Sequence, residues 1–170
     1  MRKLILLLLI PLLSFGQNQY LSSKMSFLYP NDYKLEDRRI IHDILVKLVS
    51  KDVNNNENIV VNINYNYNSI DDVNISEEIK AIKEEMESGL KLLNTKYKVD
   101  LISSTKRKIH SKEIIEFIFK SELPEYDITS YQLKYLYVEN GKSCYIIITS
   151  DDGKDYSSIA NYILKDFKFL

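Results

Sequence analysis

The sequence predicts an α+β fold in which a largely antiparallel central sheet is covered by helices on both faces. Hydrophobic residues recur at every second position in several segments and at every third or fourth in others, which indicates strands mixed with helices. Segments 114–119 and 144–148 are apolar on both alternating sets, as expected for a sheet covered on both faces. Asn140-Gly141, between two strand patterns, predicts a type I′ hairpin and therefore antiparallel neighbours.

Residues 1–16 have the layout of a signal peptide that is cleaved on export. Two basic residues precede an apolar run at 4–13, and small Ser14 and Gly16 stand at the −3 and −1 positions before Gln17. A membrane anchor needs about 20 apolar residues, roughly twice this run. We therefore expect an exported protein, periplasmic or extracellular, with no membrane span after the signal is removed.

The composition narrows the function classes. Removing residues 1–16 leaves 154 residues and removes two of the 23 basic side chains, so the net charge falls from −1 to −3. We expect a single domain at 17–170, which at this length buries about 68–70% of its extended surface. The charge balance argues against nucleic-acid binding. One cysteine and two histidines exclude an internal disulfide and a cysteine-based zinc site, and leave little material for an imidazole metal centre.

The first mature segments read as strands. Ser26 to Tyr29 form a short apolar run that ends at a Pro-Asn-Asp turn signal. Residues 58–67 alternate apolar side chains with asparagines, which predicts a strand with one mainly polar face. That asparagine face is either a ligand-binding ladder or, as we prefer, the solvated side of an edge strand.

Residues 76–94 change to a helical period, with Ser76 as the expected N-cap and two glutamates in the first turn. Four strands, a helix and a short terminal strand are expected after it, in this order: 97–103, 113–120, 131–138, 143–149, 154–165 and 167–169.

Residues 40–49, IIHDILVKLV, are ambiguous. Their apolar residues match a helical stripe, but the β-branched side chains also suit a strand over 44–50 that returns into the strand at 58. Periodicity alone does not decide between the two.

Three stretches resemble the PsbP-like family. FLYPNDYKL at 27–35 is similar to the family's strand, Tyr-Pro and aromatic start. ENIVVNINYN at 57–66, with the helix after it, is similar to its asparagine-containing strand and following helix. YVENGKSCYIIITSDDGKDYSSIANYILKDFKFL at 137–170 is similar to its hairpin, helix and terminal strand. Tyr33 replaces the usual tryptophan, and Asp166 replaces a usual serine.

The resemblance implies an α/β/α sandwich and favours a strand at 44–50. It also implies an accessory role, because the photosynthetic member of the family supports a membrane complex without catalysing a reaction itself. No residue of this chain points to a photosystem.

The search for catalytic motifs is negative, so the sequence predicts no catalytic residue, no cofactor and no metal ligand. Neither His42 nor His110 lies in a catalytic motif, and His110 reads as a solvated residue. Cys144 lies in an apolar stretch and is expected to be a buried, inert thiol.

Three features have both a functional and a structural interpretation. The carboxylates of 151–155 could attract calcium, but turn or helix-capping roles are preferred. The basic run 106–108 could bind a polyanion or an anionic lipid surface, but a solvated turn is preferred. The strand tyrosines could form a binding face, but sheet packing is preferred; they are Tyr65, Tyr67, Tyr131, Tyr135, Tyr137 and Tyr145.

Two functions follow from the sequence. The first is an exported, non-catalytic binding or accessory protein of the cell envelope, with an unknown protein, glycan or lipid partner and an unknown interaction surface. The second is a small extracytoplasmic hydrolase that uses dispersed carboxylates. It requires a cleft that holds paired Asp or Glu side chains.

Overall fold

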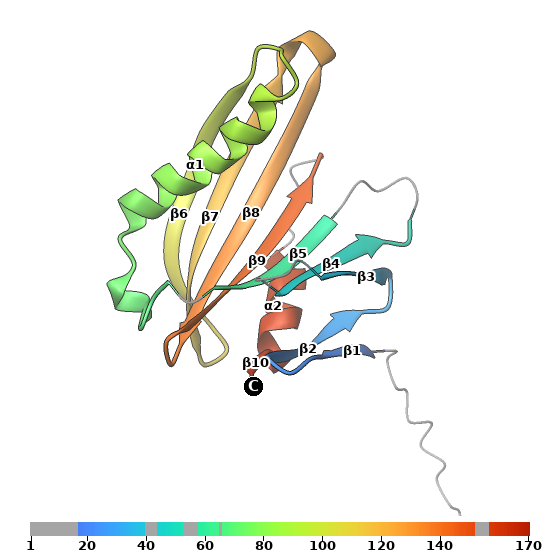
Figure 1. The fold of residues 1–170 in the computed structure, drawn as a ribbon, viewed down its shortest axis with the longest axis vertical. Coiled ribbons are helices and arrows are strands. Elements are labelled where there is room, and N and C mark those ends of the chain that lie inside the picture. The colour runs from blue at the N-terminus through green and yellow to red at the C-terminus, as the bar shows by residue number, and fades with distance from the viewer. Residues whose placement is uncertain (1–16, 40–43, 53–57, 65, 152–156) are drawn as a thin grey trace, which may run out of the picture.

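A computed structural model describes residues 17–39, 44–52, 58–64, 66–151 and 157–170 (Figure 1). Two antiparallel sheets make up most of it, one of seven strands in the order β3-β4-β5-β9-β8-β7-β6 and one of three in the order β1-β2-β10. The strands are β1 (Gln17–Leu21), β2 (Met25–Pro30), β3 (Tyr33–Arg39), β4 (Ile44–Ser50), β5 (Asn58–Asn64), β6 (Lys98–Ile109), β7 (Lys112–Leu123), β8 (Ile128–Glu139), β9 (Lys142–Ser150) and β10 (Lys168–Phe169). The helices are α1 (Ile75–Lys91) and α2 (Ser157–Asp166), with single 3₁₀ turns η1 (Ile70–Asp72) and η2 (Pro124–Tyr126).

The four long strands β6 to β9 form a meander joined by tight turns. Between β8 and β9, Asn140 and Gly141 have φ angles of 51° and 76°, as a type I′ hairpin turn requires. The predicted hairpin is therefore confirmed. His110 lies at the turn between β6 and β7, also with positive φ (53°).

The described part of the ambiguous segment is a strand, and residues 40–43 lie outside the described residues. β4 pairs with β3 on one side and β5 on the other, so the strand interpretation of 44–50 is confirmed over the helical one. Val46 and Leu48 are fully buried and oppose Val61 and Ile59 of β5 in the core. These two buried residues of β4 are two positions apart, which is the period of a strand and not of a helix.

Two strands were not expected from the sequence. β3 carries several charged residues and forms one edge of the large sheet, so it lacks the apolar alternation of a half-buried strand. β1 pairs with β2 in the small sheet, and β10 pairs with β2 on its other side. β1 and β3 are stabilised by hydrogen-bonded pairing with neighbouring strands, and neither has a strong hydrophobic alternation in its own sequence.

Two hydrophobic clusters pack on opposite faces of the large sheet. The α1 face includes Val99, Ile115, Phe117, Phe119, Leu136, Val138 and Tyr145, with Ile82 of α1. The other face includes Val46, Leu48, Ile59, Val61, Ile63, Ile114, Leu133, Tyr135, Cys144, Ile146 and Ile148. On this side α2 contributes Ala160, Ile163 and Leu164, and the small sheet contributes Tyr20, Met25, Phe27 and Tyr29.

The α+β class is correct, but the expected helical layer on both faces is wrong. α1 lies over β6, β7 and β8 on one face (Figure 1). The second face is covered by α2 together with the small sheet of β1, β2 and β10. The molecule is therefore not an α/β/α sandwich.

The N-terminus of α1 also differs from the prediction. Asn74, not Ser76, is the N-cap, and its Oδ1 accepts hydrogen bonds from the backbone N–H groups of Ser76 and Glu77. Ser76 lies inside the first turn, where it donates its own N–H to this cap. The helix ends at Lys91, before the expected boundary at 94.

Candidate functional site

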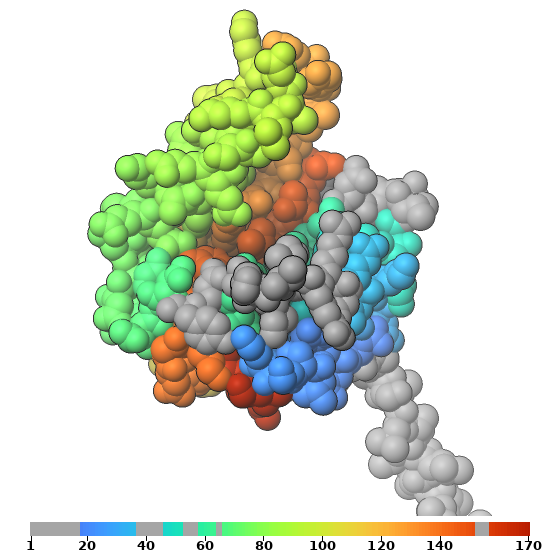
Figure 2. Space-filling model, viewed as in Figure 1, coloured from blue at the N-terminus to red at the C-terminus, as the bar shows by residue number. Residues whose placement is uncertain are grey.

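A cavity of about 450 Å³ lies between α1 and the sheet strands β5, β8 and β9. In the space-filling view α1 forms a ridge, beside which side chains of β8 and β9 remain visible (Figure 2). The residues that line the cavity are Asn62, Asn66, Tyr67, Glu78, Ala81, Ile82, Glu85, Lys134, Tyr145 and Ile147. Its volume falls within the range of small-molecule sites, about 300–1,000 Å³.

Side chains of β5, β8 and β9 that point to the same face of the sheet form the floor of this cavity. Asn62 of β5 opposes Tyr145 of β9, and Ile147 of β9 opposes Lys134 of β8. Because alternate side chains point to one face of a sheet, these four residues face α1. The helical period places Glu78, at the first turn of α1, on the same side as Ile82 and Glu85.

Lys134 is a buried cation paired with one carboxylate. The residue is 3% exposed, and its Nζ donates a hydrogen bond of 2.6 Å to Oε2 of Glu85. The Glu85 side chain itself is 69% exposed. An ammonium group has three donors, and the bond to Glu85 uses one of those of Lys134. The carboxylate end of the pair lies in solvent.

Glu78 is held by two tyrosines. The phenol of Tyr67 donates to Oε2 of Glu78, and the phenol of Tyr145 donates to Oε1. Burial, together with the neighbouring Glu78 carboxylate, raises the pKa of Tyr67 to about 12 and also raises the pKa of Tyr145. Both phenols therefore stay protonated at neutral pH and act as donors.

Asn62 supplies a buried acceptor to the cavity. Its Oδ1 is shielded from solvent and has no hydrogen-bond partner among the described residues. Buried polar atoms are normally paired, since an unpaired one costs about 1–3 kcal/mol. The strand of alternating asparagines therefore contributes one amide to the lining of the cavity, and its interpretation as an edge strand is wrong, because β5 lies between β4 and β9.

The two carboxylates of the cavity lie about two helical turns apart on α1, and both accept hydrogen bonds. Glu78 and Glu85 are seven positions apart on α1, which corresponds to about 10 Å of helical rise. Each carboxylate here already accepts hydrogen bonds, Glu78 from two tyrosines and Glu85 from Lys134.

The histidines and the acidic segment of the sequence analysis lie elsewhere. His110 is exposed at the β6–β7 turn and does not line the cavity. His42 lies outside the described residues. Of segment 151–155 only Asp151 is described, and it is exposed, so calcium binding there stays a prediction. Across the described residues no group of three or more His, Cys, Asp or Glu side chains could hold a metal ion.

The basic run 106–108 is part of a strand, so its assignment as a solvated turn is wrong. It belongs to β6, which extends well beyond the predicted end at residue 103. Lys106 pairs with Asp71, and Arg107 donates a hydrogen bond of 2.6 Å to Glu116 on β7. Charged side chains suit this strand because it forms an edge of the large sheet.

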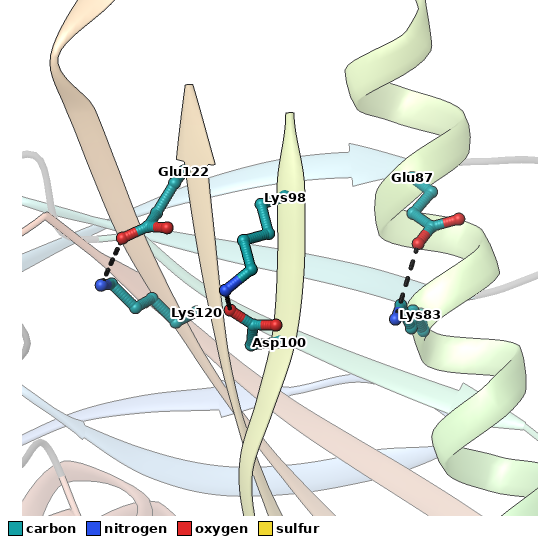
Figure 3. Close-up of polar contacts among 6 residues, drawn as sticks. All are labelled: Lys83, Glu87, Lys98, Asp100, Lys120 and Glu122. Atoms are coloured by element: carbon teal, nitrogen blue, oxygen red, sulfur yellow. Dashed lines mark ion pairs between the residues drawn. The ribbon is translucent and has the colours of Figure 1, made fainter. Parts of the chain in front are cut away.

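Further ion pairs occupy surfaces away from the cavity (Figure 3). Lys98 pairs with Asp100 on β6 at 2.6 Å, and Lys120 pairs with Glu122 on β7. The hydrogen bond to its carboxylate raises the pKa of each of these lysines. Exposed pairs of this kind are screened by water and salt and contribute little to stability. They do not line the cavity, so we assign them no binding role.

Cys144 and three of the six predicted strand tyrosines are buried in the core or packed against it, as predicted. Cys144 is fully buried on the face opposite the cavity, and burial raises the pKa of its thiol. Tyr135 and Tyr137 are buried in the same cluster, and Tyr131 packs against it. Tyr65 lies outside the described residues. The remaining two tyrosines, Tyr67 and Tyr145, line the cavity.

Glu78, Glu85 and Lys134 were not predicted from the sequence as site residues. One signal was present: Lys134 is a single charge in a strand whose neighbours are mostly apolar, on a sheet expected to be covered. A lysine in that position must find a counter-charge on the covering layer. Nothing in the sequence showed which acidic residue of the helix supplies it.

No protein-family model matches the sequence, and no curated protein matches it. Several solved structures resemble the fold, among them the following two. One is the solution structure of cyanobacterial PsbP (CyanoP) from Synechocystis sp. PCC 6803, with a TM-score of 0.62 and 14% identity over 92% of this chain and 94% of that one. The other, from Bacteroides thetaiotaomicron, has a TM-score of 0.59 and 13% identity over 92% of this chain, which spans about half (49%) of that longer chain.

These likenesses show that the fold is PsbP-like, as the three sequence stretches suggested. At this level of identity they speak for the fold alone. Neither described helix is both long and apolar enough to cross a membrane.

Proposed function

We propose that this chain is an exported, non-catalytic binding or accessory protein of the cell envelope, and that it takes its ligand in the cavity under α1. The mature protein is residues 17–170. The predicted signal peptide at 1–16 supports export, and the PsbP-like fold agrees with the accessory role that the family resemblance implies.

One observation carries the non-catalytic part of the proposal. The charged groups that line the cavity are all engaged: Glu85 accepts from Lys134, and Glu78 accepts from the phenols of Tyr67 and Tyr145. General acid–base catalysis needs a group free to exchange a proton near neutral pH. Fixed donors and acceptors around a preformed cavity suit recognition instead.

Equilibrium dialysis tests binding and catalysis together. The mature chain is dialysed against the small-molecule and soluble-glycan fraction released from cell envelopes of the native organism, and both compartments are compared by mass spectrometry. We expect one class of compound to accumulate with the protein in unchanged chemical form. Conversion of any compound to a smaller product supports the hydrolase alternative, and equal composition of both compartments contradicts the proposed function.

Two variants make the dialysis specific to the cavity. Lys134→Met removes the buried cation and should abolish accumulation. Glu84→Gln, its matched control, lies next to Glu85 on α1 but pairs outside the cavity with exposed Lys80, and should retain full binding. Export is tested separately by N-terminal sequencing of the protein recovered from envelope or medium, where cleavage before Gln17 is expected and an intact Met1 in the cytoplasm is the contrary result.

A further inference from the structure

Two groups on the floor of the cavity have hydrogen-bonding capacity left for a ligand. Lys134 donates to Glu85 and retains donor capacity, while Oδ1 of Asn62 is a buried acceptor without a partner among the described residues. They lie on opposite sides of β9, two strand spacings apart across the sheet and two residues apart along it, so their backbones are separated by roughly 12 Å. The long lysine side chain and a ring-sized ligand can span this distance.

The chemistry of these two groups selects the class of ligand. A ligand must donate to Asn62 and accept from Lys134. A carboxylate only accepts and an ammonium only donates, whereas a hydroxyl group does both. Several hydroxyl groups on one small ring therefore satisfy both ends of the site.

The charge of the cavity favours a neutral ligand. Its described lining residues carry two carboxylates, Glu78 and Glu85, against one ammonium, Lys134. An anion would be repelled by this balance, even at the donors that Lys134 retains. A cation would compete with Lys134 for Glu85. A neutral ligand leaves the Lys134–Glu85 pair intact and accepts hydrogen bonds from the remaining N–H groups of Lys134.

The rest of the lining suits a sugar ring. Ala81, Ile82 and Ile147 provide an apolar surface for ring C–H groups, and Asn66 adds a second amide. Asn66 and Glu85 are exposed, so the cavity is reached from solvent. Its volume of about 450 Å³ has room for one or two sugar rings.

We infer that the cavity under α1 binds a neutral, hydroxyl-rich ligand of one or two sugar rings, with Lys134 donating to it and Asn62 accepting from it. This inference rests on the proposed function, because it names the ligand class of the same site.

The test is an NMR titration of isotope-labelled mature chain with two matched pairs of sugars. Glucose is compared with sodium glucuronate, its anionic counterpart, and N-acetylglucosamine with glucosamine, its cationic counterpart; maltose and chitobiose cover the two-ring case. We expect saturable shifts of backbone amides around Asn62, Lys134 and α1 with at least one neutral sugar, and weaker binding of both charged counterparts.

Variants assign the binding to the two named groups. Lys134→Met and Asn62→Leu should each weaken binding by about tenfold or more, because each removes a hydrogen bond in a shielded site. Glu84→Gln should bind as the wild type does. If Lys134→Met does not fold, Asn62→Leu still decides the matter, and the dispersion of its amide spectrum shows whether it is folded.

The outcomes separate this inference from the proposed function. Preference for glucuronate or glucosamine, with shifts at the same residues, overturns the neutral hydroxyl class and leaves the proposed function standing. Failure of all six sugars to bind, while envelope material still accumulates in the dialysis experiment, does the same. Failure of both experiments removes the proposed function as well.

Discussion

Replacing Glu85 by glutamine tests the idea that this exposed carboxylate is the counter-charge of a buried lysine. The Lys134 side chain is 4% exposed and its Nζ lies 2.6 Å from Oε2 of Glu85. Removing one partner of a fully buried ion pair costs about 3–5 kcal/mol, because the other charge is left without compensation. Since Glu85 is 69% exposed, water reaches that end, and we reduce the expected loss of unfolding free energy to about 1–3 kcal/mol.

The reciprocal replacement should behave differently. Lys134→Met keeps an unbranched side chain of similar length and leaves Glu85 free in solvent. We therefore expect a change within about 1 kcal/mol, or a gain in stability, since apolar replacements of buried ions are often neutral or stabilising. In the Lys134→Met background, Glu85→Gln should then cost no more than about 0.5 kcal/mol, because the charge it compensates has gone.

Urea unfolding of the mature chain, followed by far-UV circular dichroism, measures these differences. Glu84→Gln is the matched control, because its pair with Lys80 spans 3.9 Å between two exposed side chains and should contribute less than about 0.5 kcal/mol. Equal losses for Glu85→Gln and Glu84→Gln, or a loss for Lys134→Met greater than that for Glu85→Gln, would refute the reasoning.

Three more predictions follow from the described contacts. Asn74→Ala should lower the free energy of unfolding by about 1 kcal/mol through loss of the α1 N-cap, whereas Ser76→Ala should have little effect; the reverse order in urea unfolding contradicts the cap assignment. Cys144 should not react with a thiol reagent in the native protein and should react fully in denaturant, while fast native labelling would show that the thiol is accessible. Stability should fall as pH rises from about 10 to 12, because unfolded tyrosine loses its proton near pH 10 while Tyr67 holds its proton up to a pKa of about 12. Tyr67→Phe and Tyr145→Phe should each reduce that slope, and an unchanged slope in both variants would mean that the network with Glu78 does not hold these protons.

The sequence predicted the elements whose periodicity comes from burial. The helix at α1 and the strands β7, β8 and β9 have apolar stripes that follow from the faces they bury, and the Asn140-Gly141 turn needs two residues with positive φ. β3 was missed because an edge strand rich in charge has no such stripe. The layer of small-sheet strands over the second face was also missed, since pairing partners far apart in the chain leave no local signal.

The candidate site was predictable only in fragments. The asparagine alternation marked Asn62, but its significance depends on whether a helix covers that part of the strand. Lys134 gains its meaning from Glu85, 49 positions earlier in the chain. Such a pair is set by how α1 crosses the sheet, which side-chain packing decides and local sequence does not.

Chemical-shift mapping of the labelled mature chain, titrated with the small-molecule fraction of cell envelopes, tests the central claim that the cavity under α1 is the binding site. We predict saturable shifts at Asn62, Lys134, Tyr145 and neighbouring residues of α1, which Lys134→Met removes and Glu84→Gln preserves. Shifts confined to another surface would contradict the claim, for example the end of the long hairpins where Leu92, Tyr126 and Ile128 are exposed. The absence of any shift would contradict it equally.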